Sequence, residues 1–302
     1  MDMMERLMNL DRRWLYLLVG LAAVIPILAP LNLPVNVSKP VQDLYDRIES
    51  LEPGEIIMVS FDYGPSTGPE NDPMGDAIIM HALARDLRVV IIALYPLGGV
   101  TEAREELERC VGDLDPPNGQ IESTRFPGKV YGRDFIYFGY KDGGLAAMRL
   151  MSDNMHEVFP ADFYGTPLEE YELGREVQGY DDVAFVMSLA TGIIGEWWAN
   201  LVNAQFGTPV AVGCTAVSAP KYFAYYRAGQ MFALLAGLKG AAEYEYLVSE
   251  KYPQLADITD SFIYNAGKGW DVQSVVYSII TLFIIIGNVA FIVERRRQKR
   301  GM

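Results

Sequence analysis

The stretch from Thr208 to Tyr246, TPVAVGCTAVSAPKYFAYYRAGQMFALLAGLKGAAEYEY, carries the signals that decide the fold. Its beginning, residues 209–214, is a short apolar run bounded by turn residues, which predicts a buried strand. After a polar and aromatic loop, small residues recur every four positions, at Gly229, Ala233, Gly237 and Ala241. On a helix this spacing places them on one face, where the lack of side-chain bulk lets another backbone approach. The stretch therefore predicts a strand, a loop and a helix whose small-residue face packs inside the domain or against another subunit.

Similar apolar runs precede this stretch, at residues 56–61, 88–94, 134–140 and 182–189. Segments with a helical pattern separate them, and an alternation of strands and helices is typical of parallel βαβ units. The runs lack a polar alternation, which fits a sheet that is covered on both faces. The sequence therefore predicts an α/β domain of the doubly wound type with a mostly parallel, five-stranded sheet.

Two apolar segments flank this domain. Residues 14–31 carry no charge, and at 1.5 Å per residue they would span roughly 27 Å, close to the thickness of the hydrocarbon core. A cleaved signal peptide is the alternative, but the run is long and the small-residue cleavage pattern is poor, which favours an uncleaved anchor. Residues 275–293 are also apolar apart from Asn288, which either bonds to a neighbouring helix or lies near the headgroups.

The charges around these segments predict their orientation. A run of arginine and lysine follows residue 294, which is a stop-transfer pattern and places the tail in the cytoplasm. We expect a two-pass protein of the cell membrane with both termini inside and the main domain in the periplasm or outside the cell. The predicted parts are a cytoplasmic N-terminus (1–13), a first transmembrane helix (14–33), the extracytoplasmic domain (34–272), a second transmembrane helix (273–293) and a basic tail (294–302).

The charge of the outer domain limits its partners. The whole chain carries −14 at pH 7, residues 1–13 are neutral in sum and residues 294–302 carry +4, which leaves −18 for the remainder. Such an acidic domain is unsuited to binding the phosphates of nucleic acid. We therefore expect the lipid bilayer as a partner and no nucleic acid.

No pattern in the chain predicts a cofactor or a metal. The segment GPSTGP at residues 64–69 lacks both the Lys-Ser/Thr ending of a phosphate loop and the GxGxxG spacing of a dinucleotide site. Cys110 and Cys214 have no partners at the spacing of metal ligands. An extracytoplasmic location would allow them to form a disulfide, but Cys214 follows a buried strand, where a free cysteine behaves as a small apolar residue.

Polar side chains follow the predicted strands, at the edge where open parallel sheets bind ligands. The alternative is that these residues only cap turns and helix starts. The residues that we single out as candidate ligand-binding residues are Asp62, Ser66, Glu70, Thr191, Thr215, Arg227 and Gln230.

A second candidate site is catalytic. Ser218 and Lys221 are spaced as S-x-x-K, and a Ser–Lys dyad would activate the hydroxyl as a nucleophile. The other motifs of serine acylating enzymes do not follow in the required order, and Pro220 disfavours a helix through the motif.

Two segments, SFDYGPSTGPENDP and AGQMFALLAGLKGAAEYE, give the chain a resemblance to a group of bacterial membrane-anchored α/β proteins. The resemblance would span most of residues 40–250. It implies no chemistry, and it draws attention to Asp62, Glu70, Gln230 and Glu243.

Three functions are compatible with these patterns. The first is a non-enzymatic scaffold or interaction subunit that assembles with itself or with another membrane protein through its outer domain and its spans. The candidate interface residues are Gly229, Ala233, Gly237, Ala241 and Asn288. The second is a membrane-bound serine hydrolase that uses Ser218 and Lys221. The third is an extracytoplasmic ligand-binding or sensor domain with its pocket at the strand ends. The absence of a complete catalytic signature favours the first.

Overall fold

The computed structural model describes residues 11–31, 33–96, 99–114, 121–255 and 265–300. The predicted cytoplasmic N-terminus and the last residues of the basic tail therefore lie largely outside the described residues. The chain forms two compact units, Val35–Ala266 and a second unit that combines Met1–Pro34 with Gly267–Met302.

The first unit is built on a six-stranded sheet in the order β3-β2-β1-β4-β5-β6. All neighbouring strands pair in parallel, for example Val59 of β1 with Ile91 of β2 and with Met187 of β4. From β1 the chain adds β2 and β3 on one side, and it then crosses back to add β4, β5 and β6 on the other side. The strand order therefore reverses between β1 and β4, as in the Rossmann fold. The strands are β1 (Ile56–Asp62), β2 (Arg88–Ala93), β3 (Phe135–Tyr140), β4 (Phe185–Ala190), β5 (Val210–Cys214) and β6 (Ala233–Ala236).

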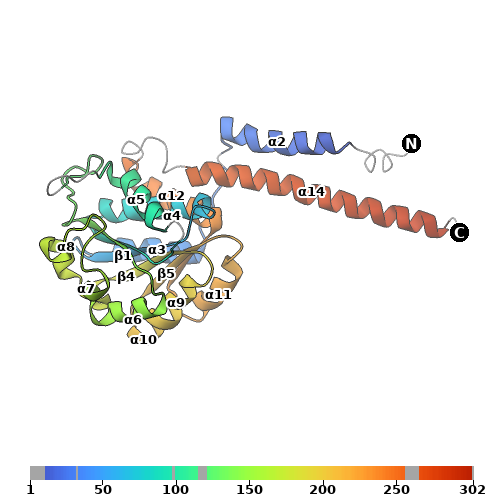
Figure 1. Cartoon of the computed structure of the whole chain (residues 1–302). Helices are drawn as coiled ribbons and strands as arrows, with labels where there is room; N and C mark the ends of the chain where they lie inside the picture. The colour runs from blue at the N-terminus through green and yellow to red at the C-terminus, as the bar shows by residue number, and fades with distance from the viewer. Residues whose placement is uncertain (1–10, 32, 97–98, 115–120, 256–264, 301–302) are drawn as a thin grey trace. The chain divides into compact units, whose positions relative to one another are not determined.

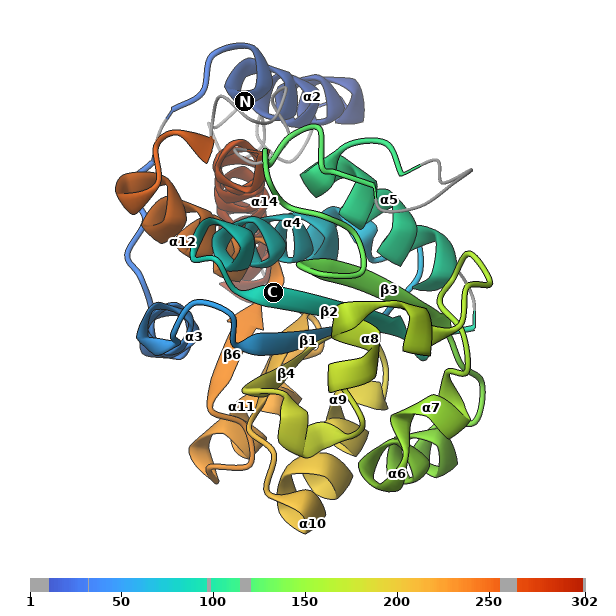
Figure 2. The ribbon, with the colours of Figure 1, turned by 90° about the vertical axis from the view of Figure 1, so that its left-hand side faces the viewer.

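Helices cover both faces of this sheet, which explains why its strands are almost wholly buried and apolar (Figure 2). One face is covered by α4 (Gly68–Ala84), α5 (Gly99–Val111) and α12 (Gly237–Lys251). The other is covered by α6 (Leu145–Asp153), α9 (Ile194–Trp197), the π-helical turn η3 (Trp198–Asn203), α10 (Ala204–Phe206) and α11 (Ala219–Arg227). The other helical elements described in this unit are α3 (Lys39–Ser50), α7 (Met155–Val158), η1 (Leu168–Glu170), α8 (Glu172–Glu176) and η2 (Tyr180–Asp182).

The predicted fold class is confirmed, but the number of strands and the small-residue helix are wrong. Ala233 begins the sixth strand, and Ala241 lies in α12 beyond it. Gly229 and Gly237 have φ angles of +74° and +62°, which a right-handed helix does not contain. These two glycines end α11 and begin α12, so the four residues do not share a helix face. The small residues therefore belong to two glycine turns, to the short buried strand ALLA between them and to α12, and they do not form one helix face.

The second unit contains the apolar helices (Figure 1). Within the described residues, one helix is long and apolar enough to cross a membrane: residues Ala266–Val293 of α14 (Asn265–Arg300), with a mean hydropathy of 2.5. This helix begins earlier than the predicted second span. The predicted first span, residues 14–33, is wrong in length, since α2 (Arg12–Leu28) has only 17 residues and ends in the turn after Pro26. The Asn288 amide donates to the carbonyl of Ile284 in its own helix at 2.9 Å.

One side chain joins the two helical segments of this unit. Asp271, in the first turns of α14, accepts hydrogen bonds from the backbone N–H groups of Leu31 (2.9 Å) and Leu33 (3.1 Å). The carboxylate is buried, so these bonds fix the segment after α2 against the beginning of α14.

Candidate functional site

Asp62 ends β1 at the point where the strand order reverses. Its Oδ1 accepts hydrogen bonds from Ser60 Oγ (2.8 Å) and from the backbone N–H of Leu94 (3.3 Å). Its Oδ2 accepts from Ser188 Oγ (2.6 Å) and from the indole Nε1–H of Trp198 (2.8 Å). The carboxyl group therefore joins β1, β4, the end of β2 and the π-helical turn.

This environment gives Asp62 a structural role. The side chain has no exposed surface, and burial raises its pKa above the ordinary value even though the four hydrogen bonds act in the opposite direction. With four donors around two oxygen atoms, the carboxyl group presents no oxygen to a ligand. Asp62 therefore holds the neighbouring segments together at the edge of the sheet where doubly wound folds bind ligands.

The other predicted ligand residues on this edge do not gather around Asp62, apart from Thr191, and contact different parts of the domain. The backbone N–H of Thr191 donates to the carbonyl of Asp62 at 3.0 Å, so these two meet. Glu70, in the first turn of α4, accepts from the backbone N–H of Ala216 at 2.8 Å, which fixes the loop after β5. Thr215 is buried in that loop, and Ser66 is exposed in the loop after β1.

Ser218 and Lys221 are each engaged with other groups. The Ser218 hydroxyl accepts from Thr215 Oγ1 at 3.2 Å. The Lys221 ammonium forms an ion pair with Glu196 and lies 3.4 Å from the carbonyl oxygen of Gly192. A lysine that acts as a base must be deprotonated and must face its nucleophile. Here the Lys221 side chain is paired with the carboxylate of Glu196 on another helix, so the geometry gives no support to the Ser–Lys dyad.

Glu196 is the centre of a polar network between α9, η3 and α11. Its Oε2 accepts from the Tyr225 hydroxyl at 2.9 Å, and that hydroxyl accepts from Asn200 Nδ2 at 3.3 Å. Gln230 donates to Asn200 Oδ1 at 3.4 Å, which connects one predicted ligand residue to the network. Arg227 ends α11 and is exposed.

An open groove of about 620 Å³ runs beside this network, between α6 and the helical segment that follows β4. Its position follows from the topology, because both helices begin just after the carboxyl ends of their strands. Two large apolar side chains in their first turns are strongly exposed, Leu145 at 45% and Ile193 at 51%. The groove is lined by Leu145, Ala146, Arg149, Ile193, Glu196, Trp197, Asn200, Leu201 and Gln205.

The sequence determines the shape of the groove at two places. Gly144 has φ +50°, and a Cβ atom there would lie 2.9 Å from the ring of Trp197, so only glycine allows α6 to come this close. The π-helical turn then separates the roles of two adjacent tryptophans. Trp198 points inward and is fully buried on Asp62, whereas Trp197 forms part of the groove.

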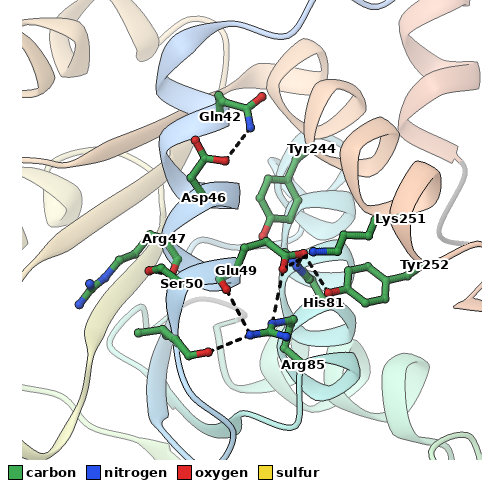
Figure 3. Close-up of polar contacts among 11 residues, drawn as sticks. Gln42, Asp46, Arg47, Glu49, Ser50, His81, Arg85, Tyr244, Lys251 and Tyr252 are labelled. Carbon is green, nitrogen blue, oxygen red and sulfur yellow. Dashed lines mark hydrogen bonds and ion pairs between the residues drawn. The ribbon is translucent and has the colours of Figure 1, made fainter.

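A second polar cluster lies at the opposite, amino edge of the sheet (Figure 3). Glu49 accepts hydrogen bonds from Lys251 Nζ (2.6 Å) and from the Tyr252 hydroxyl (2.8 Å), and its Oε1 lies 3.2 Å from His81 Nε2. Burial alone would raise the Glu49 pKa, but these hydrogen bonds lower it to about 2. His81 Nδ1 lies 2.8 Å from the Tyr244 hydroxyl.

The histidine in this cluster is neutral. Burial lowers the His81 pKa to about 4, against the opposing effect of Glu49. Because the Glu49 carboxylate can only accept, Nε2 carries the ring proton and Nδ1 accepts from Tyr244. The cluster joins the ends of α3, α4 and α12 and is packed around the ring, with Tyr45 stacked on His81 at 5.0 Å between ring centroids. The cluster is therefore a structural contact between these three helices.

Comparisons of the chain with protein-family models, with curated proteins and with solved structures give no match. Within the described ranges, no group of three or more His, Cys, Asp or Glu side chains could hold a metal ion. Both cysteines are buried as free thiols. The function is therefore interpreted from geometry, and the groove is a feature of the described residues that is open to a ligand.

Sequence reasoning missed the residues of this groove. Arg149 lies on α6 and Glu196 on α9. The sequence alone does not show that these two helices are neighbours on the same face of the sheet. A signal was present: Gly143-Gly144 and Thr191-Gly192 mark two strand ends, and each is followed within two residues by a large apolar side chain, Leu145 or Ile193. Exposed apolar residues at such a position indicate a contact surface.

Proposed function

We propose that this chain is a membrane-anchored, non-catalytic binding subunit whose α/β domain lies outside the cytoplasm and binds its ligand in the groove between α6 and α9. The observation that carries the proposal is the open, largely apolar groove of about 620 Å³ at the carboxyl edge of the sheet. Its volume is in the range of sites for small molecules, which are concave, mostly apolar and supplied with a few polar groups.

Anchoring rests on α14, which contains the long apolar segment and, directly after it, the basic residues of the tail. We extend the proposal to a two-pass arrangement with both termini in the cytoplasm. Its support is that α2 is apolar, belongs to the same compact unit as α14, and leads directly into the segment held by Asp271. The excess of arginine after the apolar segment of α14 favours a cytoplasmic tail.

The non-catalytic part of the proposal is supported by the contacts of the candidate nucleophile. Ser218 bonds to Thr215, and Lys221 is paired with Glu196. We expect Ser218→Ala to retain the cellular role of the protein and the full yield of folded chain. A loss of that role in a normally folded variant, together with labelling of wild type by a serine-reactive phosphonate, would instead support the hydrolase.

Assembly with a second copy or with another membrane protein remains a prediction. The face once expected to mediate it does not exist as a helix face, so its support is limited to the apolar helices. Native mass measurement of the full chain in mild detergent tests it directly, since a monomer of 33.7 kDa contradicts self-assembly.

The proposal is tested by the accessibility of single cysteines in membranes. Leu145→Cys places a thiol in the groove, and Glu250→Cys places a matched exposed thiol on α12; the native thiols are buried and should react slowly. A membrane-impermeant maleimide should label both variants in intact spheroplasts. The groove thiol should react more slowly in native membranes than in the purified chain, whereas the rate at residue 250 should not change.

Each outcome of this experiment decides one part of the proposal. If neither thiol is labelled from outside until the membrane is opened, the domain is not extracytoplasmic. For each preparation, the labelling rate at residue 145 is divided by the rate at residue 250. If both thiols are labelled and this ratio is the same in native membranes as in the purified chain, the groove is unoccupied and the binding function is refuted.

A further inference from the structure

We propose that the groove binds a free medium-chain carboxylate, with the alkyl chain along its apolar wall and the carboxylate on the guanidinium of Arg149. This inference rests on the proposed function and specifies the chemical class of the ligand. It follows from three properties of the groove: its apolar wall, its uncompensated positive charge and its size.

The apolar wall comes from two different helices. Leu145 and Ala146 lie in the first turn of α6, while Ile193 and Trp197 come from the segment after β4. Leu145 and Ile193 expose about half of their surface, so covering them with an alkyl chain removes apolar area from water. An alkyl chain is an apolar occupant that follows such an open groove without requiring hydrogen-bond partners.

The charge of the groove comes from Arg149. Two ionised side chains line it, Arg149 and Glu196. Glu196 is already neutralised by Lys221 and receives a hydrogen bond from Tyr225. The guanidinium of Arg149 is exposed on α6 and has no hydrogen bond or ion pair with any residue that the structure describes, while the backbone carbonyl of this residue accepts from the Ser152 hydroxyl. In a domain whose net charge is strongly negative, the groove thus presents an unpaired cation beside an apolar wall.

A carboxylate is the head group that suits this cation. A guanidinium offers a planar pair of donors that matches a carboxylate. The remaining polar groups on the rim, the amides of Asn200 and Gln205, can donate to an anion. The volume of about 620 Å³ accommodates a small molecule. A soluble single-chain acid of this size fits the groove, and a bilayer lipid is the alternative that the experiment distinguishes.

The experiment uses the full chain in nanodiscs of zwitterionic lipid and an octanoate that carries a photoreactive diazirine on its alkyl chain. A matched octylammonium probe has the same chain and the opposite charge. After irradiation, peptide mapping should locate octanoate adducts in residues 145–149 and 193–205. Unlabelled octanoate should compete for these adducts, and the addition of anionic lipid to the discs should not.

Variants of Arg149 isolate the recognition of the head group. Arg149→Gln should weaken octanoate labelling of the groove about fivefold, the size expected for an exposed charge pair. Arg149→Glu should reverse the preference, so that octylammonium labels the groove better than octanoate. Arg227→Gln removes an exposed arginine outside the groove and should leave labelling unchanged. The melting temperature of each variant shows whether it is folded.

Several results would overturn the inference. Equal labelling of the groove by both probes, or labelling that does not respond to Arg149, refutes carboxylate recognition but leaves the groove as a binding site. Competition by anionic lipid refutes the free acid in favour of a membrane lipid. If neither probe labels the groove in folded protein, the ligand class is wrong, and the cysteine rates at residue 145 decide separately whether the proposed function survives.

Discussion

The neutral, buried His81 makes the stability of the domain depend on pH in a way that one substitution should reveal. His81 has no exposed surface and lies between an acceptor, Glu49, and a donor, Tyr244. His81→Gln retains one donor and one acceptor at the same site but cannot take up a proton. We therefore expect the difference in unfolding free energy between wild type and this variant to change with pH, although the fold is the same.

The magnitude follows from the two pKa values of the imidazole. The pKa is 6.5 in the unfolded chain and about 4 in the folded protein. Between these values the unfolded chain binds a proton that the folded protein does not, so the contribution of His81 is fully present above pH 6.5 and is lost as the pH falls to 4. At 1.36 kcal/mol per pH unit, wild type loses about 3 kcal/mol relative to the variant.

A difference measurement is needed because another buried group acts in the opposite direction. Burial raises the pKa of Asp76 to about 6, and the nearby Arg109 only partly offsets this effect. The folded protein then binds a proton at Asp76 before the unfolded chain does, so this contribution to stability grows as the pH falls from 6 to 4. The pH curve of wild type alone therefore does not isolate the contribution of His81.

The assay is urea unfolding of both full-length chains in mild detergent at several pH values between 4 and 7. The variant should be less stable at pH 7 because its packing and hydrogen bonds are poorer, and the difference should close by about 3 kcal/mol at pH 4. The chain has two histidines, so NMR of the imidazoles, assigned with His156→Gln, gives the His81 pKa directly. A stability difference that stays constant over the whole range would refute the neutral, buried imidazole.

Three further substitutions test the packing described above, each by thermal unfolding. Asp62→Asn should cost about 2 kcal/mol, because each carboxylate oxygen accepts an N–H and an amide nitrogen would face one of them; an unchanged melting temperature would contradict that network. Gly144→Ala should cost about 1–3 kcal/mol through the clash with Trp197, more than Gly192→Ala, which also has positive φ but open space. Gly237→Leu should lower the melting temperature by destabilising the domain itself; loss of an oligomer with unchanged stability would restore the interface hypothesis.

The sheet could be predicted because its signals are local. A buried parallel strand is a short apolar run between turn residues, and five such runs were recognisable; the observed bounds of β1 and β5 differ from the prediction by one residue each. The sixth strand, β6, has only four residues and lies between glycines. Its alanine and leucine side chains fit a helix face and a buried strand equally well. The positive φ of Gly237, which decides between the two, is a property of the backbone.

The groove could not be predicted because it depends on which helices become neighbours. Leu145 and Ile193 are far apart in the chain, and they line one groove only because the crossover after β3 returns on the same face as the helices after β4. The ligand residues predicted at the strand ends are polar. Several of them, such as Asp62 and Glu70, form hydrogen bonds with other groups of the domain. Asp62 shows why: a carboxyl group at the end of a central strand is surrounded by N–H and hydroxyl donors.

Three consecutive residues of α12 show how the domain fixes its two ends. Glu243 accepts from the backbone N–H of Ser38 at 2.9 Å, and Glu245 accepts from the backbone N–H of Ala266 at 3.2 Å. Between them, Tyr244 bonds to His81 of α4. Successive helical residues point about 100° apart, so one turn of α12 holds the segment that enters the domain, the segment that leaves it and the helix that follows β1. Both connections of the domain to the apolar helices thus depend on a single helix of its core.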